Sequence, residues 1–139
     1  MNLELIYPMA AMVLLTFLVI AKTFFARVQA VKAGETDAGY FKTYQEGRES
    51  RKGAQMSRNV INLFEAPTLF YAACITAMVA GGNTELLVTL AWVYVATRVL
   101  HTYIHIGSNK IQARIAAYFS GWLVLLGMWG TLVAGVATA

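Results

Sequence analysis

Long stretches without a charged residue constrain the fold of this chain more than any other feature. Residues 5–21 and 115–139 carry no charged side chain, and 58% of the 139 residues are apolar. A helix needs about 17–25 apolar residues to cross a bilayer, so both stretches are long enough to be membrane spans. Charged residues make up 13% of the chain, compared with roughly 25% in soluble domains. The composition therefore predicts an integral membrane protein.

Turn sequences and one polar segment divide the chain into four spans. GGNT at 81–84 and GSNK at 107–110 combine glycine with polar residues between apolar segments. We predict an all-α fold, a bundle of four transmembrane helices that forms a single domain over residues 1–139. The expected helices cover residues 3–32, 57–80, 85–106 and 112–137, with a loop at 33–56 that contains a short helix near residues 40–44.

The basic residues predict which side of the membrane each connection occupies. Eight of the 11 Lys and Arg lie between Lys22 and Arg58, and two more, Lys110 and Arg114, lie at the connection that includes 107–110, whereas 81–84 contains none. Cytoplasmic connections of membrane proteins carry the excess of Lys and Arg. We therefore expect both basic connections in the cytoplasm and both termini outside it. The same distribution favours membrane topology over nucleic-acid binding as the reason for the net charge of +4.

This topology brings two polar helix faces to the same depth of the bundle. Residues three, four or seven positions apart share one face of a helix. Such faces are Arg58, Asn62 and Glu65 on the second span, and Arg98, His101 and His105 on the third. Ionisable residues at membrane depth cost free energy and face the bundle interior or a neighbouring subunit, so they indicate a functional site.

Three roles are open to this cluster, namely a structural ion pair, a metal site and an anion-binding site, and each needs different chemistry. Glu65 can pair with an arginine and fasten two helices, but such a pair needs only two residues. His101 and His105 have the i, i+4 spacing of a metal site with Glu65 as third ligand, although neighbouring arginines repel a cation. An anionic ligand fits best, because arginine side chains bind carboxylates bidentately. The cations available to it are Arg27, Arg58, Arg98, Lys110 and Arg114.

Two motifs in this region resemble those of a known family. RNVINLFEAP at 58–67, followed by RVLHTYIHIGSNKIQAR at 98–114, resembles the MAPEG family, the membrane-associated proteins in eicosanoid and glutathione metabolism, and in particular its small bacterial members. The resemblance implies a four-helix bundle in a bacterial inner membrane, assembled as a homotrimer. It also implies that glutathione, as cosubstrate, lies between subunits near the cytoplasmic face.

The resemblance assigns roles to individual residues. Arg114 is at the position of the arginine that polarises the glutathione thiol. The implied glutathione-binding residues are Arg27, Arg58, Asn62, Glu65, Arg98, His101, His105 and Tyr118. Several family members that use glutathione have tyrosine where this chain has His105. No residue is assigned to a metal.

The expected function is that of a glutathione-dependent membrane transferase or peroxidase. Its second substrate would be a hydrophobic electrophile or a lipid hydroperoxide that enters from the membrane lipids. A guanidinium group close to a thiol favours the thiolate, which is the reactive nucleophile. The alternative is a non-catalytic MAPEG-like binding or scaffold protein, since a shared fold does not establish an activity.

Overall fold

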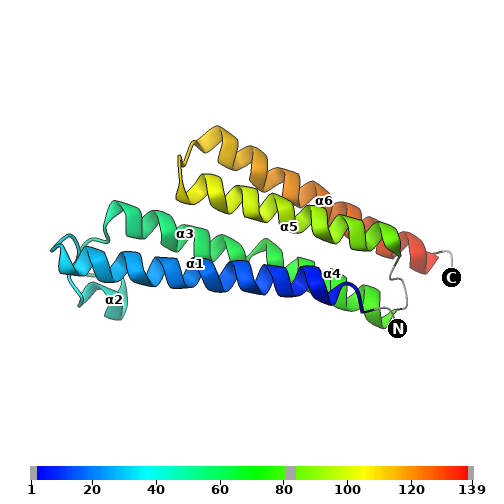
Figure 1. The fold of residues 1–139 in the computed structure, drawn as a ribbon, viewed down its shortest axis with the longest axis horizontal. Helices are drawn as coiled ribbons and strands as arrows, with labels where there is room; N and C mark the ends of the chain where they lie inside the picture. Colours follow the sequence, from blue (N-terminus) through cyan, green and yellow to red (C-terminus); the bar gives the residue numbers. More distant parts are fainter. Residues whose placement is uncertain (1–2, 81–83, 138–139) are drawn as a thin grey trace.

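The structure of the chain is a computed structural model that describes residues 3–80 and 84–137. Over these residues it contains helices and connections only. The helices are α1 (Ile6–Lys32), α2 (Tyr40–Thr43), α3 (Arg51–Phe64), α4 (Ala66–Val79), α5 (Glu85–Ile106) and α6 (Ile111–Ala137). Figure 1 shows α1 antiparallel to α3 and α4, and α5 antiparallel to α6. The all-α bundle predicted from the sequence is confirmed.

Four segments of the bundle are long and apolar enough to cross a membrane. They are Ile6–Lys32, Arg51–Val79, Glu85–Ile106 and Ile111–Ala137, and the shortest has 22 residues. At 1.5 Å per residue, 22 residues reach about 33 Å, which matches a hydrocarbon core of about 30 Å. Large apolar side chains also cover the outside of α1, where Phe17 is 64% exposed. Lipid or another subunit must cover such a surface.

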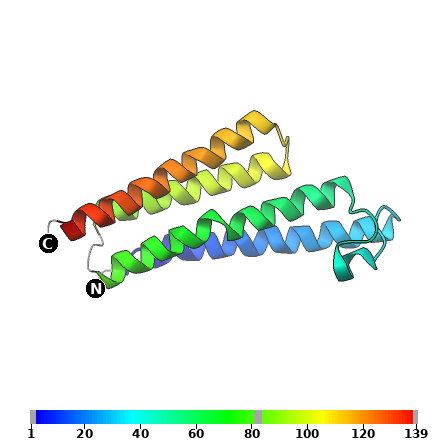
Figure 2. The same ribbon diagram turned by 180° about the vertical axis from the view of Figure 1, so that it is seen from behind.

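The second span begins earlier than predicted and consists of two helices. The Ser50 hydroxyl accepts a hydrogen bond from the Gly53 N–H at 3.1 Å and caps α3, so the helix begins six residues before the predicted residue 57. The helix breaks at Glu65, whose ψ is −94°, far from the helical value of about −42°. Pro67 lies in the first turn of α4, where its missing N–H is tolerated. Figure 2 shows α3 and α4 continuing in one direction across this break.

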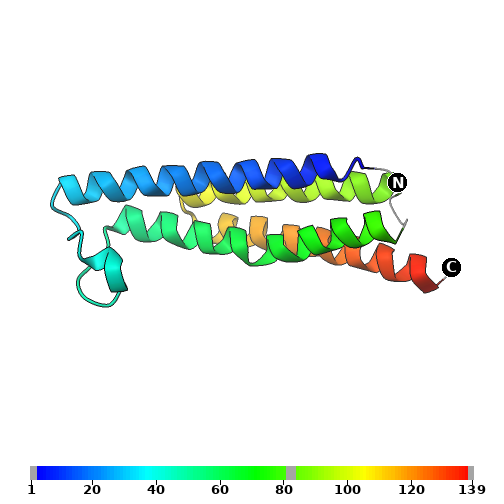
Figure 3. The same ribbon diagram turned by 90° about the horizontal axis from the view of Figure 1, so that it is seen from below.

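The connections lie at opposite ends of the bundle. The 33–50 connection and the 107–110 turn are at the end where α1 finishes and α6 begins, opposite the start of α1 (Figures 1 and 3). The long connection is shorter than the predicted 33–56 and contains α2. Of the predicted 81–84 turn, residues 81–83 lie outside the described residues. Both basic connections therefore share one end of the molecule.

Candidate functional site

A small crevice lies between α3 and α6, beside α5 and near the 107–110 turn. It has a volume of about 190 Å³. Its walls are formed by Asn62 of α3, His101 of α5, and Arg114, Ile115 and Tyr118 of α6. We call this site the α3–α6 crevice. Four residues that were predicted to act together are thus brought together from three helices.

A neutral amide holds the Arg114 guanidinium. Arg114 Nη1 donates a hydrogen bond to Asn109 Oδ1 at 2.8 Å. Asn109 has a φ of 49°, a left-handed conformation that asparagine tolerates better than most residues. The Asn109 N–H donates to the Ile104 carbonyl at 2.8 Å and closes the turn after α5. Asn109 was not predicted as the partner of Arg114, although asparagine in a glycine-led turn is a signal for this conformation.

The two histidines have different environments. His101 lines the crevice, and its ring centroid lies 5.6 Å from that of Tyr118. His105 is not part of the crevice wall, and its side chain is 1% exposed inside the bundle. Its carbonyl accepts a hydrogen bond from Gln55 Nε2 of α3. His105 thus lies behind His101, with its backbone joining α5 to α3.

Arg98 is enclosed between α5 and α6. Its side chain is 1% exposed, and Nη2 donates a hydrogen bond to the Tyr118 carbonyl at 2.9 Å. The guanidinium carbon lies 5.1 Å from the ring centroids of both Tyr94 and Tyr118. Within the described residues, Arg98 Nε and Nη1 have no hydrogen-bond partner. Arg98 therefore contacts the back of the crevice wall within a single chain.

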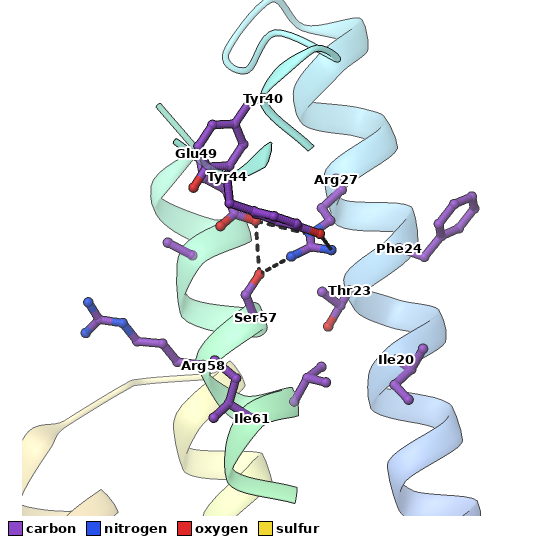
Figure 4. Close-up of a pocket in the computed structure, with 12 residues that line it drawn as sticks. Ile20, Thr23, Phe24, Arg27, Tyr40, Tyr44, Glu49, Ser57, Arg58 and Ile61 are labelled. Atoms are coloured by element: carbon purple, nitrogen blue, oxygen red, sulfur yellow. Dashed lines mark hydrogen bonds and ion pairs between the residues drawn. The ribbon is translucent and has the colours of Figure 1, made fainter. Parts of the chain in front are cut away.

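A second and larger cavity lies between α1 and α3 at the same end of the bundle. Its volume is about 630 Å³. We call it the α1–α3 cavity, and its walls include Ile20, Phe24, Arg27, Tyr44, Glu49, Ser57 and Arg58. Figure 4 shows Arg27 directed toward Ser57, whereas the Arg58 guanidinium points away from α1. Arg27 and Arg58 are thus in a different cavity from Arg114.

Arg27 is paired inside the chain. Its Nε lies 3.1 Å from Glu49 Oε1, and its Nη2 donates to the Ser57 hydroxyl at 2.8 Å. The guanidinium carbon also lies 5.0 Å from the Phe41 ring centroid and 5.6 Å from that of Tyr44. These contacts attach the 33–50 connection to α1 and α3. Glu49 was not predicted as a partner, because the two residues are far apart in sequence.

The chain matches a known protein family over nearly its whole length. The MAPEG family model matches residues 5–134. The chain belongs to the MAPEG family. No curated protein and no solved structure gave a significant match. Membership and the four apolar helices identify the chain as a multi-pass membrane protein.

The residues predicted to bind glutathione occupy three environments in this MAPEG protein. Asn62, His101, Arg114 and Tyr118 line the α3–α6 crevice, and Arg27 and Arg58 line the α1–α3 cavity. Arg98 and His105 are buried, and Glu65 is exposed at the break between α3 and α4. Among the described residues, no three metal-binding side chains gather into one group. Binding of glutathione by each of these residues stays a prediction.

The α3–α6 crevice is suited to a small anion. Its wall contains a guanidinium, an imidazole, a phenol and an amide, and none of the five lining residues is a carboxylate. Opposite charge and N–H donors favour a thiolate or carboxylate at such a place. Its volume of about 190 Å³ is smaller than the roughly 300–1,000 Å³ of typical ligand pockets. One chain therefore encloses only part of a ligand as large as a tripeptide.

Proposed function

We propose that this MAPEG protein is a glutathione-dependent membrane transferase or peroxidase that acts on hydrophobic electrophiles or lipid hydroperoxides. The observation that carries the proposal is the position of Arg114 in a crevice without a carboxylate in its wall. Its guanidinium is held by the neutral Asn109 amide. The positive charge is therefore available to an anionic sulfur.

Thiolate activation follows from this arrangement. A guanidinium close to the glutathione thiol favours the deprotonated form, which is the nucleophile. In conjugation, the sulfur forms a bond to carbon while the leaving group departs with the bonding electron pair. In peroxide reduction, the sulfur attacks the terminal oxygen, the O–O bond breaks and an alcohol leaves, so that glutathione becomes a sulfenic acid. A second glutathione thiol then displaces water and forms glutathione disulfide. Arg114 would stabilise negative charge that develops on either partner.

The rest of the glutathione site is proposed to come from neighbouring subunits of a homotrimer. The crevice is small, and Arg27 and Arg58 line another cavity of the same chain. Arg58 and Glu65 are exposed, so each can meet a ligand held by a second copy. Native mass spectrometry of the detergent-solubilised protein tests the trimer. A monomer that still binds glutathione tightly would contradict this part of the proposal.

Activity is tested with protein purified in detergent, glutathione, and either an aryl chloride electrophile or a lipid hydroperoxide. Arg114→Ala is expected to lower kcat by about 100- to 1,000-fold, as is found when a single charge-stabilising donor is removed. Arg48→Ala, at an exposed loop position, is the matched control and is expected to stay within about twofold of wild type. Wild-type protein no faster than Arg114→Ala would contradict the proposed activity. Glutathione binding without turnover would favour a non-catalytic binding or scaffold protein.

We also propose a bacterial inner-membrane location with both termini outside the cytoplasm. The excess of Lys and Arg at the end that holds the 33–50 connection supports this orientation. Single cysteines at Leu3 and Thr43, in a Cys74→Ala background, can be labelled in intact cells with a membrane-impermeant maleimide. Labelling is expected at position 3 only. Labelling at position 43 only would show that the protein has the opposite orientation in the membrane.

A further inference from the structure

We propose that Arg98 and Gly121 together position Tyr118, and with it the α6 wall of the α3–α6 crevice. Arg98 is then a positioning residue that acts through Tyr118 rather than a direct glutathione ligand. The functional consequence rests on the proposed glutathione chemistry. The contact itself, which holds α6 against α5, lies within one chain and does not depend on that chemistry.

The close approach of the two helices depends on the absence of a side chain at Gly121. A Cβ atom added there would lie 2.1 Å from Arg98 Nη2 and 2.9 Å from both its guanidinium carbon and Nε. Such distances are far below van der Waals contact, so any larger residue must displace the guanidinium. Cβ atoms added at Gly127, Gly130 or Gly135 of the same helix would meet nothing within 4 Å. Gly121 is therefore specifically matched to Arg98.

The Arg98 guanidinium is held from several directions. Tyr94 and Tyr118 each place a ring centroid 5.1 Å from its central carbon. Tyr94 is itself stacked on Phe70 of α4, with ring centroids 4.6 Å apart and an interplanar angle of 11°. The packing thus continues from Phe70 through Tyr94 and Arg98 to Tyr118. It connects the core of the bundle to the crevice.

Among the described residues, Arg98 donates a single hydrogen bond, and its acceptor belongs to the crevice wall. Nη2 donates at 2.9 Å to the carbonyl of Tyr118, which lies one helical turn after Arg114. In an α-helix that carbonyl also accepts the N–H four residues later, that of Trp122. Loss of the Arg98 contact would release this turn of α6 from α5. The side chains of Tyr118 and Arg114, which both line the crevice, would then lose their fixed distance from His101.

The decisive comparison is Gly121→Ala against Gly127→Ala, the same change on the same helix. A displacement of about 1 Å in a positioned group can cost on the order of 100-fold in rate, so Gly121→Ala is expected to lower kcat/KM for glutathione conjugation by that factor. Gly127→Ala is expected to stay within about twofold of wild type. Equal effects of the two substitutions would overturn the proposal.

Hydrogen exchange of the ligand-free protein provides a readout that does not depend on activity. Gly121→Ala is expected to raise exchange at the Trp122 amide roughly tenfold, because local opening of this turn becomes easier. The Gly127→Ala protein is expected to exchange as wild type does. If wild-type protein shows no glutathione activity, the proposed function fails while this measurement still decides whether Arg98 and Gly121 hold α6. Unchanged exchange in Gly121→Ala would overturn the positioning role.

Arg98→Lys tests the same contact from α5, and it replaces Gly121→Ala as the test if that variant does not fold. Lysine keeps the charge but lacks the planar fork that stacks between two rings while reaching a carbonyl. Its effects on exchange and on kcat/KM are expected to match those of Gly121→Ala. The double variant is expected within about twofold of the more impaired single variant, since both changes break one contact. Effects that multiply would show independent roles and overturn the proposal.

Discussion

The α3–α6 crevice and the α1–α3 cavity lie at the same end of the bundle, and each contains an arginine with a different partner. Arg27 of the cavity is paired with the Glu49 carboxylate at 3.1 Å. Arg114 of the crevice is held by the neutral Asn109 amide at 2.8 Å. The charge of Arg27 is thus neutralised within the chain, whereas that of Arg114 is oriented and left uncompensated by its wall.

This difference shows that the number of arginines at one depth does not identify the binding site. A paired arginine already has its anion, and it stabilises the connection that supplies the carboxylate. An arginine held by an amide keeps its affinity for an anionic ligand, because an amide carries no net charge. The partner of each arginine therefore distinguishes a structural position from a reactive one.

The largest effect among the following variants is expected when the crevice receives its own carboxylate. Asn62→Asp replaces an amide with a carboxylate of nearly the same shape in the crevice that Arg114 also lines. The new carboxylate is expected to pair with Arg114 and repel a thiolate, with kcat/KM for glutathione conjugation roughly 100-fold lower than in wild type. Asn62→Ala is the control for loss of the amide alone. Equal kcat/KM values for Asn62→Asp and Asn62→Ala would mean that the positive charge of the crevice does not contribute to the activity.

The orienting role of Asn109 is expected to have an intermediate effect. Asn109→Gly removes the hydrogen bond to Arg114 but permits the φ of 49°. We expect kcat/KM about tenfold lower, in line with the loss of roughly 1.5 kcal/mol for a hydrogen bond to a charged group. Asn109→Asp distinguishes the orientation of Arg114 from its charge. The aspartate keeps the contact with the guanidinium and neutralises its positive charge. A fully active aspartate variant would contradict the need for an uncompensated cation.

The smallest effect is expected at the paired arginine of the cavity. Glu49→Gln removes the ion pair with Arg27 but preserves the shape of the side chain. We expect a loss of about 1 kcal/mol or less in the free energy of unfolding, because partly exposed ion pairs contribute little. Thermal unfolding measures it, with Glu46→Gln in the exposed part of the loop as control. A loss of activity larger than that of Asn109→Gly would place Arg27 and Glu49 in the reactive site.

Much of the fold could be predicted from local properties of the chain. The absence of charged residues in 5–21 and 115–139 predicted two membrane-spanning helices. The third helix was predicted with the bounds that the structure has, Glu85–Ile106. The start of the second span was missed because Arg51, Lys52 and Gly53 give its first turn the composition of a polar loop. Ser50 caps α3, whereas the Ser57 hydroxyl binds Arg27 instead.

Helical periodicity assigned Arg58, Asn62 and Glu65 to one face and Arg98, His101 and His105 to another, because that spacing is a property of any helix. The sequence by itself therefore determined the four spans, the spacing of their polar residues and the end of the bundle at which most of these residues lie. It could not determine which arginine meets a carboxylate, since Arg27 and Glu49 are joined only when the loop folds onto α1. Likewise, only the distance between α5 and α6 decided that Arg98 would be enclosed against Gly121. Contacts between helices depend on how rigid elements pack, and no local pattern in the chain encodes those distances.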